Sequence, residues 1–151
     1  MLRTKLNDAL KGAMKSQDAR RTSTLRLILA ALKDRDIDAK GKGNSEGISD
    51  DDILSMLQGM VKQRRDSIAL YEQGGRKDLA AQETEEIAII EEFLPRQMAK
   101  GEIEAAVKSV LAELKASGLK DMGRVMAALK AKHAGQMDFA QASGIVKGLL
   151  G

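Results

Sequence analysis

Apolar residues recur every three or four positions along almost the whole chain, which is the spacing of one face of an α-helix. In the first part of the chain this pattern predicts two helices, one ending near Ser16 and one that starts at Asp18 and fades around Asp38. Asp18 is a suitable N-cap, because its carboxylate can accept a hydrogen bond from a free N–H of the first turn. The apolar face of the second helix consists of Leu25, Ile28, Leu29 and Leu32.

Residues 39–47, rich in Gly, Lys and Asn, interrupt the pattern and predict a flexible loop. Ser49 is then expected to cap a longer helix, whose three leading aspartates suit the positive end of the helix dipole. Gly74 and Gly75 break this helix, and a further one ends at Pro95. Because the break is short, the two helices should form a long antiparallel hairpin.

Two charged residues interrupt the apolar stripes of this hairpin. Arg64 lies ten positions before Gly74, and Glu83 lies eight positions after Gly75. One interpretation is a partly buried Arg64–Glu83 ion pair that fixes the register of the helices without adding net stability, because desolvation offsets much of the attraction. The other is that either side chain extends to water.

Beyond Pro95 the helices become shorter. The pattern predicts a joint over residues 96–101, then three helices, one over residues 102–116 and two capped by Asp121 and Asp138. With only one Tyr, two Phe and no Trp, the core must be aliphatic. We therefore expect an all-α protein with an N-terminal helical domain, residues 1–94, and a small C-terminal three-helix domain, residues 95–151.

Composition excludes most self-contained catalytic sites. Cysteine is absent, and His133 is the only histidine, so thiolate catalysis, a His-based triad and Cys- or His-rich metal sites are excluded. The chain also has an acidic helix face, formed by Glu83, Glu85, Glu86, Glu91 and Glu92. Such a face is more typical of a solvated surface than of acid–base or metal chemistry. No apolar run reaches the length of a signal-peptide core or a membrane span. We expect a cytoplasmic binding protein with no catalytic residue, metal, cofactor or membrane partner.

Charge is distributed unevenly, with +6 over residues 1–45, −7 over residues 46–95 and +4 over residues 96–151. This suits nucleic-acid binding but also an ordinary solvated surface. Lys120, Gly123 and Arg124 surround a predicted helix N-terminus, where the dipole and free N–H groups attract anions, and Lys130 and Lys147 add to the positive field. These residues can also be explained without an anion, because Asp121 would cap the helix and Gly123 would allow close helix packing. With so few aromatic residues, an RNA partner would be a folded RNA recognised by shape and phosphates.

Short motifs in a consistent order along nearly the whole chain resemble the GatB/YqeY family, in particular a stand-alone YqeY-like protein. They are Ala13-Met14-Lys15, Leu25-Arg26-Leu27, residues 62–68, residues 75–80, Phe93-Leu94-Pro95, residues 120–126 and residues 146–150. The resemblance implies an all-α fold. Its C-terminal part is similar to the tail domain of the B subunit of the glutamine-dependent aspartyl/glutamyl-tRNA amidotransferase, which belongs to tRNA recognition, whereas amidation belongs to other domains of that enzyme.

The leading hypothesis is therefore a non-catalytic protein that binds tRNA or associates with a tRNA amidotransferase. The residues expected to contact RNA are Lys120, Gly123, Arg124, Lys130 and Lys147. One alternative is a protein-binding adaptor without an RNA role of its own, docking through the acidic hairpin or an exposed Met/Leu surface to a protein partner, for example one in tRNA metabolism. Another is a carbon–nitrogen ligase of the amidotransferase type with glutamine as amido donor, as family labels suggest, although the chain lacks a nucleophile–base pair for it.

Overall fold

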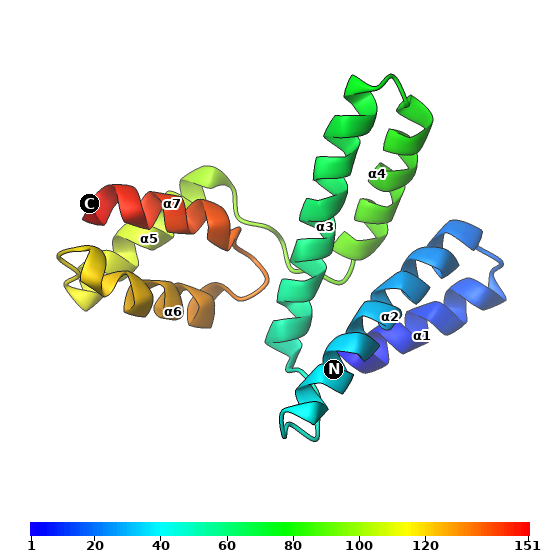
Figure 1. Cartoon of the computed structure of the whole chain (residues 1–151), viewed down its shortest axis with the longest axis horizontal. Coiled ribbons are helices and arrows are strands. Elements are labelled where there is room, and N and C mark those ends of the chain that lie inside the picture. The colour runs from blue at the N-terminus through cyan, green and yellow to red at the C-terminus, as the bar shows by residue number, and fades with distance from the viewer. The chain divides into compact units, whose positions relative to one another are not determined.

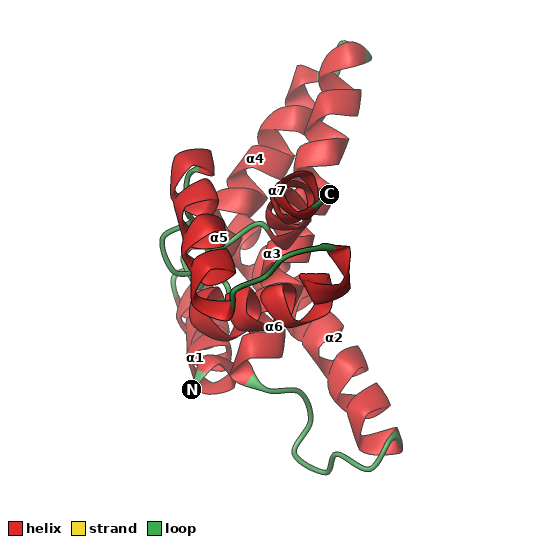
Figure 2. Ribbon diagram, turned by 90° about the vertical axis from the view of Figure 1, so that its left-hand side faces the viewer, coloured by secondary structure: helices red, strands yellow, loops and turns green.

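The computed structural model describes residues 1–151, and its regular elements are all helical (Figure 1). They are α1 (Leu2–Lys15), α2 (Ala19–Gly41), α3 (Asp50–Gln73), α4 (Lys77–Glu91), α5 (Lys100–Leu114), the 3₁₀ turn η1 (Leu119–Asp121), α6 (Met122–His133) and α7 (Phe139–Leu150). Figure 2 shows these helices joined by loops, with no strand. The predicted all-α fold is confirmed. None of the helices is both long and apolar enough to cross a membrane.

The chain divides into two compact units, Met1–Leu94 and Pro95–Gly151. Unit 1 contains α1 to α4, and unit 2 contains α5 to α7 with η1. Each unit has a core of its own, and the two cores share no residue. Each unit therefore meets by itself the basic requirement of a small domain, a separate buried apolar cluster.

Unit 1 is built from two antiparallel helix pairs, α1 with α2 and α3 with α4, and α2 also packs against α4. Fully buried residues come from all four helices, including Leu6, Leu25, Ile28, Ile53, Leu57 and Ile90. The expected hairpin is observed as α3 and α4, but α4 ends at Glu91 rather than at Pro95. It ends early because the chain turns there and brings Phe93, which is 5% exposed, into the core.

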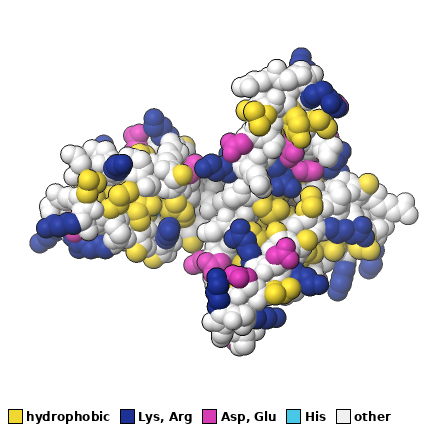
Figure 3. All heavy atoms as spheres, in the orientation of Figure 1, with side chains coloured by type: hydrophobic (Ala, Val, Ile, Leu, Met, Phe, Trp, Pro, Cys, Tyr) yellow, Lys and Arg dark blue, Asp and Glu magenta, His cyan; other side chains and the backbone are white.

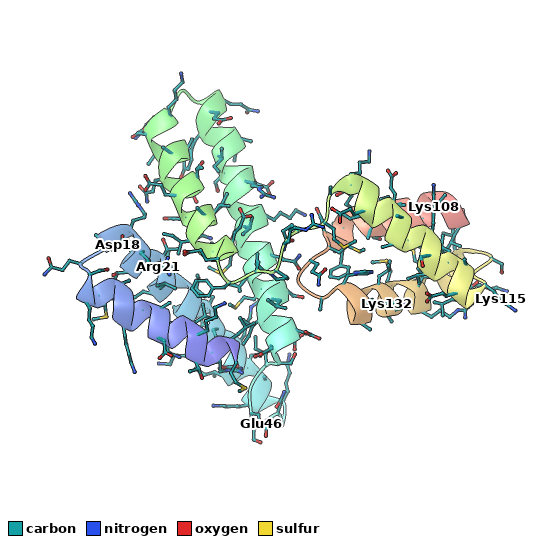
Figure 4. All side chains as sticks on the ribbon, turned by 180° about the vertical axis from the view of Figure 1, so that it is seen from behind. Asp18, Arg21, Glu46, Lys108, Lys115 and Lys132 are labelled. Atoms are coloured by element: carbon teal, nitrogen blue, oxygen red, sulfur yellow. The ribbon has the colours of Figure 1, made fainter.

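Two of the predicted N-caps are present in unit 1. The Asp18 carboxylate accepts a hydrogen bond from the Arg21 N–H at 3.1 Å, and Figure 4 shows both residues at the start of α2. The Ser49 hydroxyl accepts one from the Asp52 N–H at 3.2 Å. These side chains satisfy N–H groups that a helix start leaves without partners, so α2 and α3 begin where the sequence predicts.

The loop between α2 and α3 is fastened to two helices. The Asp36 carboxylate accepts hydrogen bonds from Arg3 Nε at 3.1 Å, from Arg3 Nη2 and from the Ile48 N–H at 2.9 Å. Arg3 Nη2 also donates to the Ile48 carbonyl at 2.7 Å. Gly47, at φ +83°, is buried against this group, and a Cβ there would lie 2.3 Å from Asp36 Oδ1. We call these contacts of Arg3, Asp36, Gly47 and Ile48 the loop clamp.

The residues before α5 are also held. Gln97 Nε2 donates to the Gly135 carbonyl at 2.6 Å, and the Met98 N–H donates to the Gln136 carbonyl at 2.8 Å, which ties this segment to the loop between α6 and α7. The predicted joint over residues 96–101 is shortened, because α5 already begins at Lys100. The Glu102 carboxylate accepts the Ala99 N–H at 3.1 Å and so provides half of a capping box where no Ser or Thr is present.

Unit 2 is a three-helix bundle of α5, α6 and α7 with an aliphatic core. Its buried residues are Ile103, Val107, Val110, Val125, Leu129, Met137, Ala142 and Val146. Asp138 caps α7 as predicted, since its carboxylate accepts the N–H groups of Ala140 at 3.0 Å and Gln141 at 3.2 Å. The predicted cap at Asp121 is wrong, because no side chain caps α6.

Candidate functional site

A partly buried ion cluster lies between α3 and α4. Arg64 Nε is 3.8 Å from Glu83 Oε2 and 2.9 Å from Glu86 Oε2. The side chains of Arg64 and Glu86 are only 12% and 9% exposed, so neither extends freely to water. The sequence hypothesis paired Arg64 with Glu83, whereas the structure places Glu86, one turn later on α4, as the nearer partner.

One guanidinium in this cluster faces two carboxylates. Burial raises the pKa of Glu83, the charge of Glu86 raises it further, and Arg64 opposes the shift. The cluster carries an excess negative charge when both carboxylates are ionised. Arg64 Nη1 also donates to the Met60 carbonyl at 3.3 Å, so the cluster has hydrogen bonds along α3 and across to α4. This geometry explains the charged residues inside the hairpin by helix positioning rather than by ligand chemistry.

The acidic face of α4 is neutralised by arginines from its neighbours. Arg20 Nε on α2 lies 3.1 Å from Glu85 Oε2, and Arg65 Nη2 on α3 lies 3.7 Å from Glu91 Oε1. Arg21 on α2 is paired with Glu92, just after α4. Together with Arg64, these arginines provide every glutamate of this face with a cation. The glutamates of this face therefore already have cationic partners within the chain.

Arg124, a predicted RNA contact, is held by the protein itself. Its Nε lies 3.2 Å from Asp121 Oδ1, and its Nη2 donates to the Leu114 carbonyl at 2.8 Å, near the C-terminal end of α5. The second oxygen of Asp121 accepts the Ser117 N–H at 2.9 Å, and this hydrogen bond is the main reason why the pKa of Asp121 is lowered. Asp121 and Arg124 thus stabilise the connection from α5 to α6.

The start of α6 differs from the open helix N-terminus that the sequence predicts. It follows directly on η1, and the Met122 N–H already donates to the Leu119 carbonyl. Gly123 is exposed, and a Cβ there would meet nothing within 4 Å, so close helix packing does not explain this glycine. Lys130 lies seven residues further along α6, about 10 Å away along the helix axis. The structure therefore does not gather all the predicted RNA contacts at one point.

Three lysines lie at one end of unit 2, which we call the basic end and define as Lys115, Lys120 and Lys147. Lys115 follows the last residue of α5, and Lys120 lies in η1. The end of α7 reaches the same place, because Gly151 lies beside Leu119 and donates its N–H to the Lys147 carbonyl at 2.9 Å. Figure 3 shows Lys and Arg side chains gathered at this end of the unit, at the left of the view.

Sequence reasoning missed Lys115 because it placed this residue inside a helix. α5 ends earlier, and Lys115 takes the left-handed conformation at φ 53° that closes the helix. Figure 4 shows Lys115 at the end of α5 and Lys108 earlier on the same helix. The only sequence signal for this ending is the Ser117-Gly118 pair, which is typical of a helix boundary.

Most basic residues of unit 2 have no carboxylate partner. Of its nine Lys and Arg residues, Arg96, Lys132 and Arg124 form ion pairs, with Glu102, Glu113 and Asp121 respectively. The other six, all exposed, are Lys100, Lys108, Lys115, Lys120, Lys130 and Lys147. Because Asp138 caps α7, only one of the five carboxylates, Glu104, neither pairs nor caps. Unit 2 therefore presents a surplus of unpaired positive charge.

No group of three or more His, Asp or Glu side chains is arranged to hold a metal ion. His133 occupies the last turn of α6, where a basic side chain suits the negative end of the helix dipole.

Comparison with known proteins gives the family. The model of the family described as Yqey-like protein matches residues 3–150. Among curated proteins, the chain is 38% identical over 114 residues to altered inheritance of mitochondria protein 41 from Lachancea thermotolerans, covering 74% of this chain and 59% of the relative. The Kluyveromyces lactis protein of that name is 35% identical over 115 residues, covering 74% of this chain and 60% of the relative. The Saccharomyces cerevisiae protein is 32% identical over 112 residues, covering 73% and 58%.

The chain thus spans about three fifths of the length of these relatives. All three are named as mitochondrial proteins, which contradicts the expectation of a cytoplasmic protein. That expectation rested on the lack of an apolar targeting segment, and a mitochondrial transit peptide is amphipathic rather than apolar. The family resemblance seen in the sequence is confirmed over almost the whole chain, and the chain belongs to the YqeY-like protein family.

Proposed function

We propose that this chain binds folded tRNA through unit 2 and does not itself catalyse amide transfer. The observation that carries the proposal is the surplus of unpaired charge, six exposed lysines without a carboxylate partner against the single carboxylate Glu104. Phosphates of an RNA would neutralise these lysines and release condensed counterions, which is the main source of such binding. The resemblance of this part of the chain to a tRNA-recognising tail domain supports tRNA as the RNA.

The basic end is the proposed contact region. Lys115, Lys120 and Lys147 come from three different segments, so they can reach phosphates that are not adjacent along one strand. Lys108, two turns before Lys115 on α5, extends this region. Arg124 has a positioning role, because it holds the α5–α6 connection from which Lys115 and Lys120 project. Recognition relies on shape and phosphates, since the chain offers no aromatic platform for stacking bases.

The test is fluorescence anisotropy of labelled folded tRNA, with an unrelated RNA duplex of equal length as competitor, over a series of salt concentrations. The variant K115Q/K120Q/K147Q should bind tRNA at least about tenfold more weakly, and the slope of log affinity against log salt should fall by roughly one per lysine removed. The matched control is K11Q/K33Q/K62Q in unit 1, whose lysines are also exposed and unpaired and whose loss changes the net charge equally.

Equal effects of the two triple variants would mean that overall charge, not the basic end, determines affinity, and would contradict the assignment. Binding that is equal for tRNA and duplex would contradict tRNA recognition. The proposal that the protein does not catalyse amide transfer is tested by incubating the purified protein with glutamine and measuring ammonia release. Sustained turnover, absent from a mock preparation, would contradict it.

A further inference from the structure

Helix α2 carries large apolar side chains on two opposite faces. One face, with Leu25, Ile28 and Leu32, is buried in the core of unit 1. The opposite face, which we call the outer stripe, consists of Ser23, Leu27, Ala30, Asp34 and Ile37, and all five residues are exposed. Leu27 and Ile37 are 50% and 59% exposed. A helix with one buried face normally carries polar residues on the other.

The spacing of the outer stripe alternates between four and three residues, which is the pattern of a seam between two packed helices. Ala30 at its centre is small enough for a second helix to approach closely. Figure 3, in which α2 faces the viewer, shows apolar, basic and acidic side chains together over this part of unit 1.

One charged residue in the stripe and one beside it have no ion-pair partner within the chain. Eight of the ten arginines of the chain form ion pairs within it, and Arg26 is one of the two that do not. Asp34, eight residues later on α2, has no ion pair either. The outer stripe therefore carries exposed apolar side chains and the unpaired Asp34, with the unpaired Arg26 directly beside it.

We propose that the protein forms a dimer in which α2 of one protomer packs antiparallel to α2 of a second copy along the outer stripe. Arg26 and Asp34 lie four residues before and four residues after Ala30. A two-fold axis beside Ala30 brings Arg26 of each protomer level with Asp34 of the partner subunit, which gives two equivalent ion pairs. A parallel pair would instead place like charges opposite each other. Charge complementarity thus selects a second copy in the antiparallel orientation.

The dimer is a weak one. A contact made by a single helix pair is smaller than the roughly 1,200–2,000 Å² of a standard stable interface. The dissociation constant should therefore lie between about 1 μM and 1 mM.

Sedimentation equilibrium of the full chain, from about 5 to 500 μM, tests this range. The average mass should rise from monomer towards dimer. R26D and D34R should each raise the dissociation constant at least about tenfold, because each places like charges across the axis. The double variant R26D/D34R should restore association, since opposite charges again meet. R35D is the matched control, because Arg35 is exposed, unpaired and about 120° around α2 from the stripe.

Circular dichroism of each variant establishes that its helices are intact, so that any loss of association is assigned to the surface. A monomer at every concentration would overturn the proposal and leave the outer stripe to a different occupant. An effect of R35D as large as that of R26D would also overturn it, and so would a double variant that is folded but remains dissociated.

Discussion

Replacing Gly47 by alanine tests whether the loop clamp contributes to the stability of unit 1. A Cβ at this position would lie 2.3 Å from Asp36 Oδ1 and 2.7 Å from Asp36 Cγ, so the carboxylate must leave its partners Arg3 and Ile48. Hydrogen bonds to a charged group contribute about 1.5–3 kcal/mol, and the lower end applies here because the Arg3 and Asp36 side chains are 28% and 19% exposed.

Alanine at a positive φ adds about 1 kcal/mol, so G47A should lower the free energy of unfolding by roughly 2.5 kcal/mol. Gly43 provides the control in the same loop. It also has a positive φ, +96°, but a Cβ there meets nothing within 4 Å, so G43A should cost only the backbone part, about 1 kcal/mol. Urea unfolding followed by the fluorescence of Tyr71 measures both, since Tyr71 is the only tyrosine, tryptophan is absent, and Tyr71 lies in unit 1.

The stability that the loop clamp contributes should also depend on pH. The hydrogen bond from Arg3 is the main reason why the pKa of Asp36 is lowered. A carboxylate with a lowered pKa in the folded state stabilises the protein above its unfolded pKa, and this contribution is lost as the pH falls below about 4. The acid-dependent loss of stability should therefore be smaller in G47A than in the wild type. Equal urea midpoints for G47A and G43A, with equal acid sensitivity, would refute the clamp.

In each unit, a pair of substitutions should have contrasting effects on stability. E86Q removes the nearer partner of buried Arg64 and should lower the free energy of unfolding, measured in urea, by about 2 kcal/mol. E83Q should be neutral or stabilising at pH 7, because a carboxyl whose pKa is raised in the folded state makes the protein less stable as the pH rises through that pKa. The reverse order of the two effects would contradict the pairing. In unit 2, R124A should lower the thermal stability measured by circular dichroism, because the Leu114 carbonyl and one oxygen of Asp121 lose their hydrogen bonds from the guanidinium. K120A should leave the thermal stability unchanged.

Local signals were sufficient for most of the fold. Apolar spacing gave the helices, and the N-caps at Asp18, Ser49 and Asp138 gave three of their starts. One error occurs where a different local contact replaces the expected one. Asp121 has the side chain of an N-cap, but its carboxylate is bound by Ser117 and Arg124 instead. Ser117 lies in the connection after α5 and Arg124 lies in the first turn of α6, and the periodic pattern of apolar residues does not show which of these contacts forms.

The sites were less predictable for a similar reason. Counting residues from the hairpin turn shows which part of α4 lies opposite Arg64. It does not distinguish Glu83 from Glu86, because the two lie one turn apart on the same side of α4. Their different burial depends on how the neighbouring helices cover α4. Likewise, the sequence indicates Lys120 and Lys147 only by their charge. The packing of unit 2 is needed to show that the end of α7 lies beside η1, with Lys115 close by.

Arginine and lysine occupy different positions in this protein, and the difference bears on how its binding can be tested. Eight of the ten arginines form ion pairs, but only Lys42 and Lys132 of the fifteen lysines do. The planar guanidinium can hold a carboxylate and a carbonyl at once, as Arg124 does, whereas an ammonium is a compact and strongly hydrated charge. Substituting a paired arginine should therefore change stability first, and substituting an unpaired lysine should change binding first. Loss of RNA affinity in R124A can arise from a displaced α5–α6 connection, whereas the same loss in K120A, at unchanged stability, would identify a direct contact.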